Sequence, residues 1–259
     1  MPFLDDNLAY IVYDTASGKH FVIDGADIAA YREVREAYGI EGAPEALFST
    51  HKHWDHAGHN EQFVQAYPGL RVISGINEPV FASNENLADG QSSEGLLNGS
   101  VIMTAFETPC HTAAHNMFIL DVLTGDLDVK KMIFTGDCLF EGGVGMFFEG
   151  NAAQMFTVFG RLFEKVTNPA ECALFFGHDY GWKNYQWAAG EAMGMLDENS
   201  CTDKNKPWAT KKAVNERCDE LRNLRESGHY STGTLLSQEM ETNLFLLGFL
   251  QSQQEGAAD

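Results

Sequence analysis

The most constraining feature of the sequence is a cluster of metal-binding residue types, His51-x-His53-x-Asp55-His56, directly after the apolar segment 46–49. Residues two apart point to the same side of an extended segment, so His51 and His53 can bind one ion together. If the chain then turns into a helix, Asp55 and His56 face a neighbouring position. One ion does not easily take all four ligands from so short a span. The spacing therefore predicts two adjacent metal sites, and imidazole and carboxylate groups suit Zn²⁺ and related first-row ions.

Further residues of the same types stand where other predicted strands end. These are His111 after the strand 100–106, Asp137 after the strand 132–134 and His178 after the strand 173–176. Strand ends followed by loops are where α/β proteins gather their sites. A lone His is most often an ordinary hydrogen-bonded residue. Five His and two Asp at such positions, however, predict that these side chains meet at one binding site.

Strand and helix patterns alternate up to about residue 181. Short apolar strands are predicted at 10–13, 20–23, 46–49, 70–73, 100–106, 117–122, 132–134 and 173–176. Asp27 is placed to cap a helix that reaches Tyr38, and apolar spacings of three and four predict another helix over 152–166. Beyond Tyr180 we expect no strand, but helices near 184–196, 210–226 and 235–249, with a polar linker at 197–207. The expected organisation is a mixed α/β domain at 1–181 and a small helical domain at 182–259.

Composition narrows the classes of partner. Lys and Arg number 17 against 37 Asp and Glu, which gives a formal charge of −20 and disfavours nucleic acid and anionic membranes as partners. No run of about 18 uncharged apolar residues occurs, and the N-terminus has no basic segment leading into an apolar one. Five scattered cysteines without CxxC spacing predict reduced thiols, and hence a cytoplasmic location.

These motifs resemble the metallo-β-lactamase superfamily, whose signature is His-x-His-x-Asp-His, and their surroundings resemble glyoxalase II, the hydroxyacylglutathione hydrolases. Similar strings surround 50–60, 108–112, 134–139, 148–150 and 177–180, the segment 6–12 is similar to the family's first strand, and the tail is similar more loosely. The resemblance implies an α/β fold in the form of an αββα sandwich, followed by a helical substrate-binding domain.

The resemblance also implies two divalent metal ions as cofactors. Zn²⁺ is favoured by the His-rich set, and Fe or Mn is chemically admissible. The implied ligands are His51, His53 and His111 for one ion and Asp55, His56 and His178 for the other, with Asp137 bridging both. A bridging hydroxide, oriented by Asp55, would attack the carbonyl of a small-molecule acyl thioester. The implied function is hydrolysis of S-2-hydroxyacyl thiol conjugates, a step of methylglyoxal detoxification.

The expected pocket for the carrier thiol departs from the family pattern. The family has a Lys and a Tyr in a GxGKFYEG-like segment, where this chain has Met146 and Phe148, and the tail segment 243–250 is uncharged. Tyr180 and Asn184 match family positions near the thiol. The identity of the carrier thiol is therefore left open. It is either glutathione or a thiol that has no carboxylate for the protein to bind, or that even carries positive charge, such as trypanothione.

Other functions share the motif. A metal-dependent lactonase or another acyl hydrolase of the superfamily is the main alternative, although Trp54 and the Tyr180 segment look more like the thioesterase. The charge counts against a nuclease, and the complete ligand set counts against a non-catalytic relic. His59, where the family has a second Gly, is interpreted as a residue on the surface or behind the ligands. The sequence does not indicate the oligomeric state.

Overall fold

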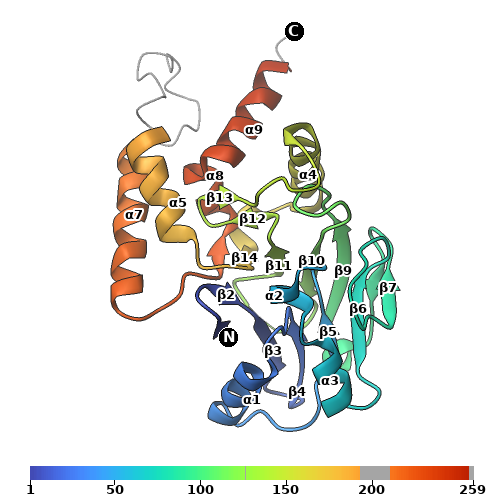
Figure 1. Ribbon diagram of the computed structural model, residues 1–259. Helices are drawn as coiled ribbons and strands as arrows, with labels where there is room; N and C mark the ends of the chain where they lie inside the picture. Colours follow the sequence, from blue (N-terminus) through green and yellow to red (C-terminus); the bar gives the residue numbers. More distant parts are fainter. Residues whose placement is uncertain (126, 193–210, 257–259) are drawn as a thin grey trace.

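Two β-sheets form the centre of the fold in a computed structural model that describes residues 1–125, 127–192 and 211–256 (Figure 1). The first sheet has the order β3 (Tyr10–Asp14), β4 (Lys19–Ile23), β5 (Ala46–Phe48), β6 (Arg71–Gly75), β7 (Glu85–Leu87). The second has the order β15 (Thr234–Leu235), β14 (Cys172–Phe176), β11 (Lys131–Gly136), β10 (Asn116–Val122), β9 (Val101–Glu107), β8 (Ser92–Ser93). Strands β4 to β7 run parallel, and in the second sheet β11 and β14 form the parallel pair.

The two sheets pack face to face through apolar side chains. Phe48 and Ile73 of the first sheet lie in one buried cluster with Met103, Phe118 and Leu120 of the second. The rings of Phe48 and Phe118 lie 5.1 Å apart at an angle of 67°. Successive strand residues point to opposite faces, so the remaining apolar residues of each strand need cover from outside.

Helices supply that cover on both outer faces. On the first sheet, Tyr31 and Phe63 of α1 and α3 pack against Val22 and Leu47. On the second, α4, α8 and α9 pack against strand residues such as Leu174. The helices are α1 (Ile28–Ala37), α2 (Trp54–Ala57), α3 (Asn60–Ala66), α4 (Ala152–Lys165), α5 (Gly181–Trp187), α7 (Lys211–Glu226), α8 (Leu236–Thr242) and α9 (Leu244–Gly256). The predicted αββα sandwich is confirmed.

Shorter elements complete the described ranges. The two-stranded pairs are β1 (Pro2–Phe3) with β2 (Asn7–Leu8) and β12 (Leu139–Phe140) with β13 (Gly143–Val144). Single turns of tighter or wider helix occur at Leu96–Gly99, Pro169–Glu171 and Ala188–Ala192. Among the residues that the structure describes, no helix is both long and apolar enough to span a membrane.

The segment after Tyr180 differs from the sequence prediction in two places. The expectation of no strand there is wrong, because Thr234–Leu235 pairs antiparallel with β14. Two residues are too short for an alternation pattern, and pairing at the sheet edge makes them a strand. The helix expected over 235–249 is two helices, interrupted at Asn243, whose side chain accepts hydrogen bonds from the N–H groups of Phe245 and Leu246. The predicted linker 197–207 lies outside the described residues, and the division at residue 181 stays a prediction.

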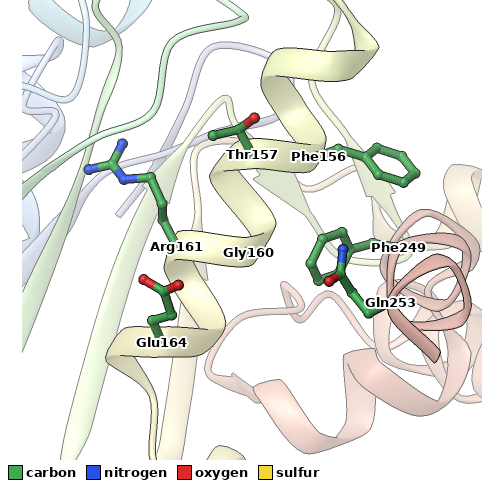
Figure 2. Close-up of a pocket in the computed structure, with 7 residues that line it drawn as sticks. All are labelled: Phe156, Thr157, Gly160, Arg161, Glu164, Phe249 and Gln253. Carbon is green, nitrogen blue, oxygen red and sulfur yellow. The ribbon is translucent and has the colours of Figure 1, made fainter. Parts of the chain in front are cut away.

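A groove of about 350 Å³ runs between α4 and α9 on the outer side of the second sheet. Figure 2 shows Phe156 and Phe249 meeting at one side of it, while Arg161 points the other way. The two rings lie 5.7 Å apart. Arg161 is engaged by the Glu107 carbonyl at 2.9 Å and by the Asp89 carboxylate. This groove is separate from the residues that the sequence nominates for metal binding.

Candidate metal centre

The predicted metal ligands come from the ends of four strands in both sheets. His51, His53, Asp55 and His56 follow β5, His111 follows β9, Asp137 follows β11 and His178 follows β14. After β5 the backbone bends at residues 50–52, and it is extended at His53, which has a ψ of 145° and precedes α2. That conformation brings the His51 and His53 rings to one side, as the spacing predicted.

Three imidazole nitrogens converge at one end of the cluster. His53 Nδ1 lies 3.0 Å from His51 Nε2 and 3.1 Å from His111 Nε2. At the other end, His56 Nε2 and His178 Nε2 lie 3.3 Å apart. The structure thus brings together both predicted sets of ligands.

Asp137 lies between the two ends. Its Oδ1 is 3.2 Å from His56 Nε2, and its Oδ2 is 3.4 Å from His111 Nε2 and 3.3 Å from His178 Nε2. The turn that presents it depends on Gly136, which has a φ of 49° and would place a Cβ 2.5 Å from the Thr50 hydroxyl. Only glycine meets both conditions without strain.

Asp24 holds one imidazole from each end of the cluster. Its Oδ1 accepts from the Thr50 N–H at 2.8 Å, and its Oδ2 accepts from the Thr50 hydroxyl at 2.8 Å. Because that hydroxyl donates to Asp24, it is free to accept from His51 Nδ1, 3.0 Å away. His56 Nδ1 donates to the same Asp24 oxygen at 3.1 Å. In the neutral form of both rings the hydrogen therefore sits on Nδ1, and the Nε2 lone pair faces the cluster.

Two further imidazoles are oriented in the same way. His178 Nδ1 donates to Asp6 Oδ1 at 2.9 Å, and His111 Nδ1 donates to the Met146 carbonyl at 3.0 Å. An outer acceptor that fixes the tautomer and the ring angle is the usual companion of a metal-binding His. When these rings are neutral, the arrangement therefore presents unprotonated nitrogens toward a common centre.

The carboxylates and imidazoles of the cluster shift one another's pKa values. Burial would lower the pKa of His56, but the charge of Asp137, whose Oδ1 lies 3.2 Å away, and the hydrogen bond from His56 to Asp24 raise it well above the ordinary value. Burial also opposes protonation of His178, yet hydrogen bonds to Asp137 and Asp55 raise its pKa to about 9. A metal ligand must be deprotonated, so an ion that binds here displaces these protons. Binding should weaken as the pH falls.

The donor set fits divalent metal ions. Donor atoms within 4.8 Å of one another form three overlapping groups: His51, His53 and His111; His51, His56 and Asp137; and Asp55, His56 and His178. Asp137 Oδ1 is buried without a hydrogen-bond partner among the described residues, so it has a lone pair available to an ion. Nitrogen and carboxylate oxygen donors together suit Zn²⁺ and neighbouring first-row ions.

Three of the four predicted substrate residues lie beside the cluster. The Tyr180 ring stacks on His178 with centroids 4.7 Å apart, and the Phe148 ring lies 5.1 Å from that of His111. Met146, whose carbonyl binds His111, has a side chain that is 69% exposed. These placements allow contact with a molecule bound at the cluster.

Asn184 and His59 have different surroundings. The Asn184 amide donates to the Glu141 carbonyl at 2.9 Å, so it supports the backbone after β12. His59 is partly exposed and precedes α3, and its buried Nδ1 has no hydrogen-bond partner within the described ranges. The role of Asn184 toward a substrate stays a prediction.

Sequence reasoning missed the residues that orient the ligands. Asp24 and Asp6 are two of them, and a third is Asn7, whose amide donates to Asp55 Oδ2 at 3.0 Å. A signal for Asp24 was present, because it directly follows β4, the parallel neighbour of the strand that carries the main motif. Asp6 and Asn7 come from the N-terminal segment, and nothing in their spacing connects them to His178 or Asp55.

Known proteins similar to this chain include hydroxyacylglutathione hydrolases. The hydroxyacylglutathione hydrolase-like protein of Gallus gallus is 32% identical over 206 residues, which are 80% of this chain and 68% of that protein. The cytoplasmic hydroxyacylglutathione hydrolase of Arabidopsis thaliana is 28% identical over 246 residues, or 95% of this chain and 86% of that protein. No family model matches the chain.

Solved structures with the same architecture are more distant in sequence. ETHE1 from Myxococcus xanthus superposes with a TM-score of 0.59 at 18% identity, over 95% of this chain and 86% of that one. The B3 metallo-β-lactamase BLEG-1 gives a TM-score of 0.55 at 14% identity, over 92% and 93%. These structures show that the fold is that of metallo-β-lactamases. The extent of identity to the Gallus gallus protein shows that the chain belongs to the hydroxyacylglutathione hydrolase family.

Proposed function

We propose that the chain is a binuclear metal-dependent thioester hydrolase. Its substrates are S-2-hydroxyacyl thiol conjugates, such as S-lactoylglutathione or the corresponding trypanothione conjugate, and its products are the hydroxy acid and the free thiol. The observation that carries this proposal is the convergence of overlapping His and Asp groups with Asp137 between them. Relatives named hydroxyacylglutathione hydrolase make a thioester the substrate class to test.

The residues would hold two divalent ions, with Zn²⁺ favoured over Fe or Mn by the His-rich donors. One ion would take His51, His53 and His111, the other Asp55, His56 and His178, and Asp137 would contact both. When bound, such ions lower the pKa of a water molecule and polarise a carbonyl oxygen.

The chain itself supplies orientation. Burial would raise the pKa of Asp55, but hydrogen bonding to His178 and the charge of His56 hold it well below the ordinary value, so Asp55 is an acceptor. Asn7 holds Asp55 Oδ2 from the side at 3.0 Å, and Asp55 would accept a hydrogen bond from the attacking water. Tyr180 on His178 borders the reacting carbonyl on one side. No strong general acid is needed, because a thiolate leaves readily.

Thiol release from S-lactoylglutathione tests the proposal. We expect the chain loaded with Zn²⁺ to bind two ions and to release thiol, and we expect a chelator to abolish the release reversibly. Asp55→Ala should reduce kcat by about a hundredfold or more, whereas His229→Ala, at an exposed position on the segment after α7, serves as the matched control. Metal-loaded protein that releases no thiol from any 2-hydroxyacyl thioester, or that opens acyl lactones far more efficiently, would contradict the assignment.

The remaining proposals concern context. We propose a small-molecule substrate, a cytoplasmic location and no nucleic-acid or membrane partner, on the basis of the charge of −20 and the free cysteines Cys110, Cys138, Cys172 and Cys218. We also propose that residues 182–259 serve the catalytic domain, residues 1–181, as a substrate-binding unit.

A further inference from the structure

An exposed apolar strip borders the metal centre. It consists of Met146, Phe147 and Phe148, which follow β13 and are 69%, 36% and 64% exposed. Trp54, which stands between the ligand positions His53 and Asp55 in the chain, is a separate apolar side chain that is 68% exposed. Large apolar side chains that gather on a surface beside polar functional groups commonly mark a binding site.

The strip is tied to the cluster. The Phe148 ring lies edge-on to His111 at 5.1 Å and to His53 at 6.1 Å. The Met146 carbonyl accepts from His111 Nδ1. Directly before it, Gly145 packs so closely that a Cβ would lie 1.7 Å from the Asp137 carbonyl oxygen. A thioester with its carbonyl at the cluster therefore has a portion of its structure beside Phe148.

Charged groups near the cluster do not favour an anionic carrier. Lys52 is held by both oxygens of Glu149, at 2.7 and 2.8 Å. Lys183 lies 3.9 Å from Asp6 Oδ2 and over the Tyr180 ring at 5.8 Å. A carboxylate on the substrate would have to compete with Glu149 or Asp6 for these two cations. A substrate carboxylate placed against the strip itself would lose hydrating water without gaining a hydrogen-bond or ion-pair partner.

We propose that this strip binds an uncharged apolar portion of the carrier thiol, so that the preferred substrates are 2-hydroxyacyl thioesters whose carrier has no free carboxylate. The inference rests on the proposed thioester hydrolysis and specifies its substrate class. In that reaction water adds to the thioester carbonyl, the C–S bond breaks, and the acid and the thiol are released, whichever carrier is bound. Phe148 supplies a ring face and Met146 an adaptable thioether for an alkyl or aromatic group.

A pair of matched substrates tests the proposal on the metal-loaded full chain. S-lactoylglutathione and its dimethyl ester share the lactoyl group and the thioester bond, but the ester has both carboxylates of the carrier masked. We expect kcat/KM to be about tenfold or more higher for the diester, mainly through a lower KM. If the free acid is cleaved equally well or better, the inference is overturned while thioester hydrolysis stands. If neither is cleaved by protein that binds its ions, the proposed function fails as well.

Variants of the strip locate the effect. Met146→Lys should raise kcat/KM for the free acid by about tenfold, and Met146→Gln, uncharged and of similar length, should not. Phe148→Ser should raise KM for the diester with little change in kcat, whereas Tyr38→Ser, at an exposed position that ends α1, should change neither. Equal effects of Lys and Gln at position 146, or no effect of Phe148→Ser on the diester, would count against the strip. If a variant fails to fold, the two substrates on the unaltered chain decide the question.

Discussion

Glu239 makes the stability of this protein sensitive to pH. Its side chain is fully buried in α8, where Oε2 accepts from the Gly142 N–H at 2.8 Å and from the Asn243 amide at 2.9 Å. Its Oε1 lies 3.0 Å from the Tyr185 hydroxyl. The pKa of Glu239 is raised from 4.5 to about 7, mainly by burial and secondly by the charge of Glu141.

The sign of the effect follows from proton binding. Between the ordinary and the raised pKa, the folded chain keeps a proton on Glu239 that the unfolded chain has released. Stability from this group is therefore complete below the ordinary pKa, is lost progressively between the ordinary and the raised pKa, and stays lost above the raised pKa. With about 1.4 kcal/mol for each pKa unit, ionising Glu239 in the folded chain costs about 3 kcal/mol.

Glu239→Gln should remove this dependence. The amide oxygen can accept from the Gly142 N–H, and the NH₂ group can donate to the Tyr185 hydroxyl, as the protonated acid does. Urea unfolding should show similar stability of variant and parent near pH 5, and a variant more stable by up to about 3 kcal/mol near pH 8. Glu241→Gln, on the exposed side of the same helix, is the control. A stability difference that does not change with pH would refute the reasoning.

Two further predictions concern the metal centre. In Asp24→Asn the amide NH₂ would donate to His56 Nδ1 and shift the ring hydrogen to Nε2. Metal affinity, measured by competition with a chromophoric chelator, should therefore fall about 10- to 100-fold. An unchanged affinity would show that the contact between Asp24 and His56 does not set the tautomer. In Gly177→Ala the added methyl group would lie 2.5 Å from Asp137 Oδ1 and 2.9 Å from the His56 ring. The metal content after dialysis should therefore fall, while the far-ultraviolet circular dichroism spectrum is retained. Full metal content would contradict the close packing of Gly177 against these two ligands.

The sequence predicted best what local chemistry decides. Asp27 caps α1 by accepting from the N–H groups of Ala29 and Ala30, and Gly39 follows its end with a φ of 63°. The ligand pattern was visible for a similar reason, because His51 and His53 stand only two positions apart and their ring centroids lie 4.6 Å apart. Such features depend on residues a few positions apart, and their outcome does not wait for the rest of the fold.

Elements that depend on distant partners were not visible. The strand Thr234–Leu235 exists because it pairs with Ala173 and Leu174, and Glu85–Leu87 exists because β6 lies beside it. Asn243 interrupts the predicted last helix because its amide is drawn to the Phe140 and Gly143 carbonyls and to Glu239. In each case a contact between segments far apart in the chain overrides a weak local preference.

The carboxylates around the cluster need positive charge, which ions or protons can supply. Asp24, Asp55 and Asp137 place three carboxylates against the imidazoles, in positions from partly to almost fully buried. A single dication balances two of these three charges and a proton on a neighbouring imidazole balances the third, whereas a pair of dications balances all three without a proton. The raised pKa values of His56 and His178 have the same origin, because protons on these rings also compensate the carboxylates. Ions and protons therefore compete for the cluster, and binding of a second ion should require the loss of protons from these imidazoles.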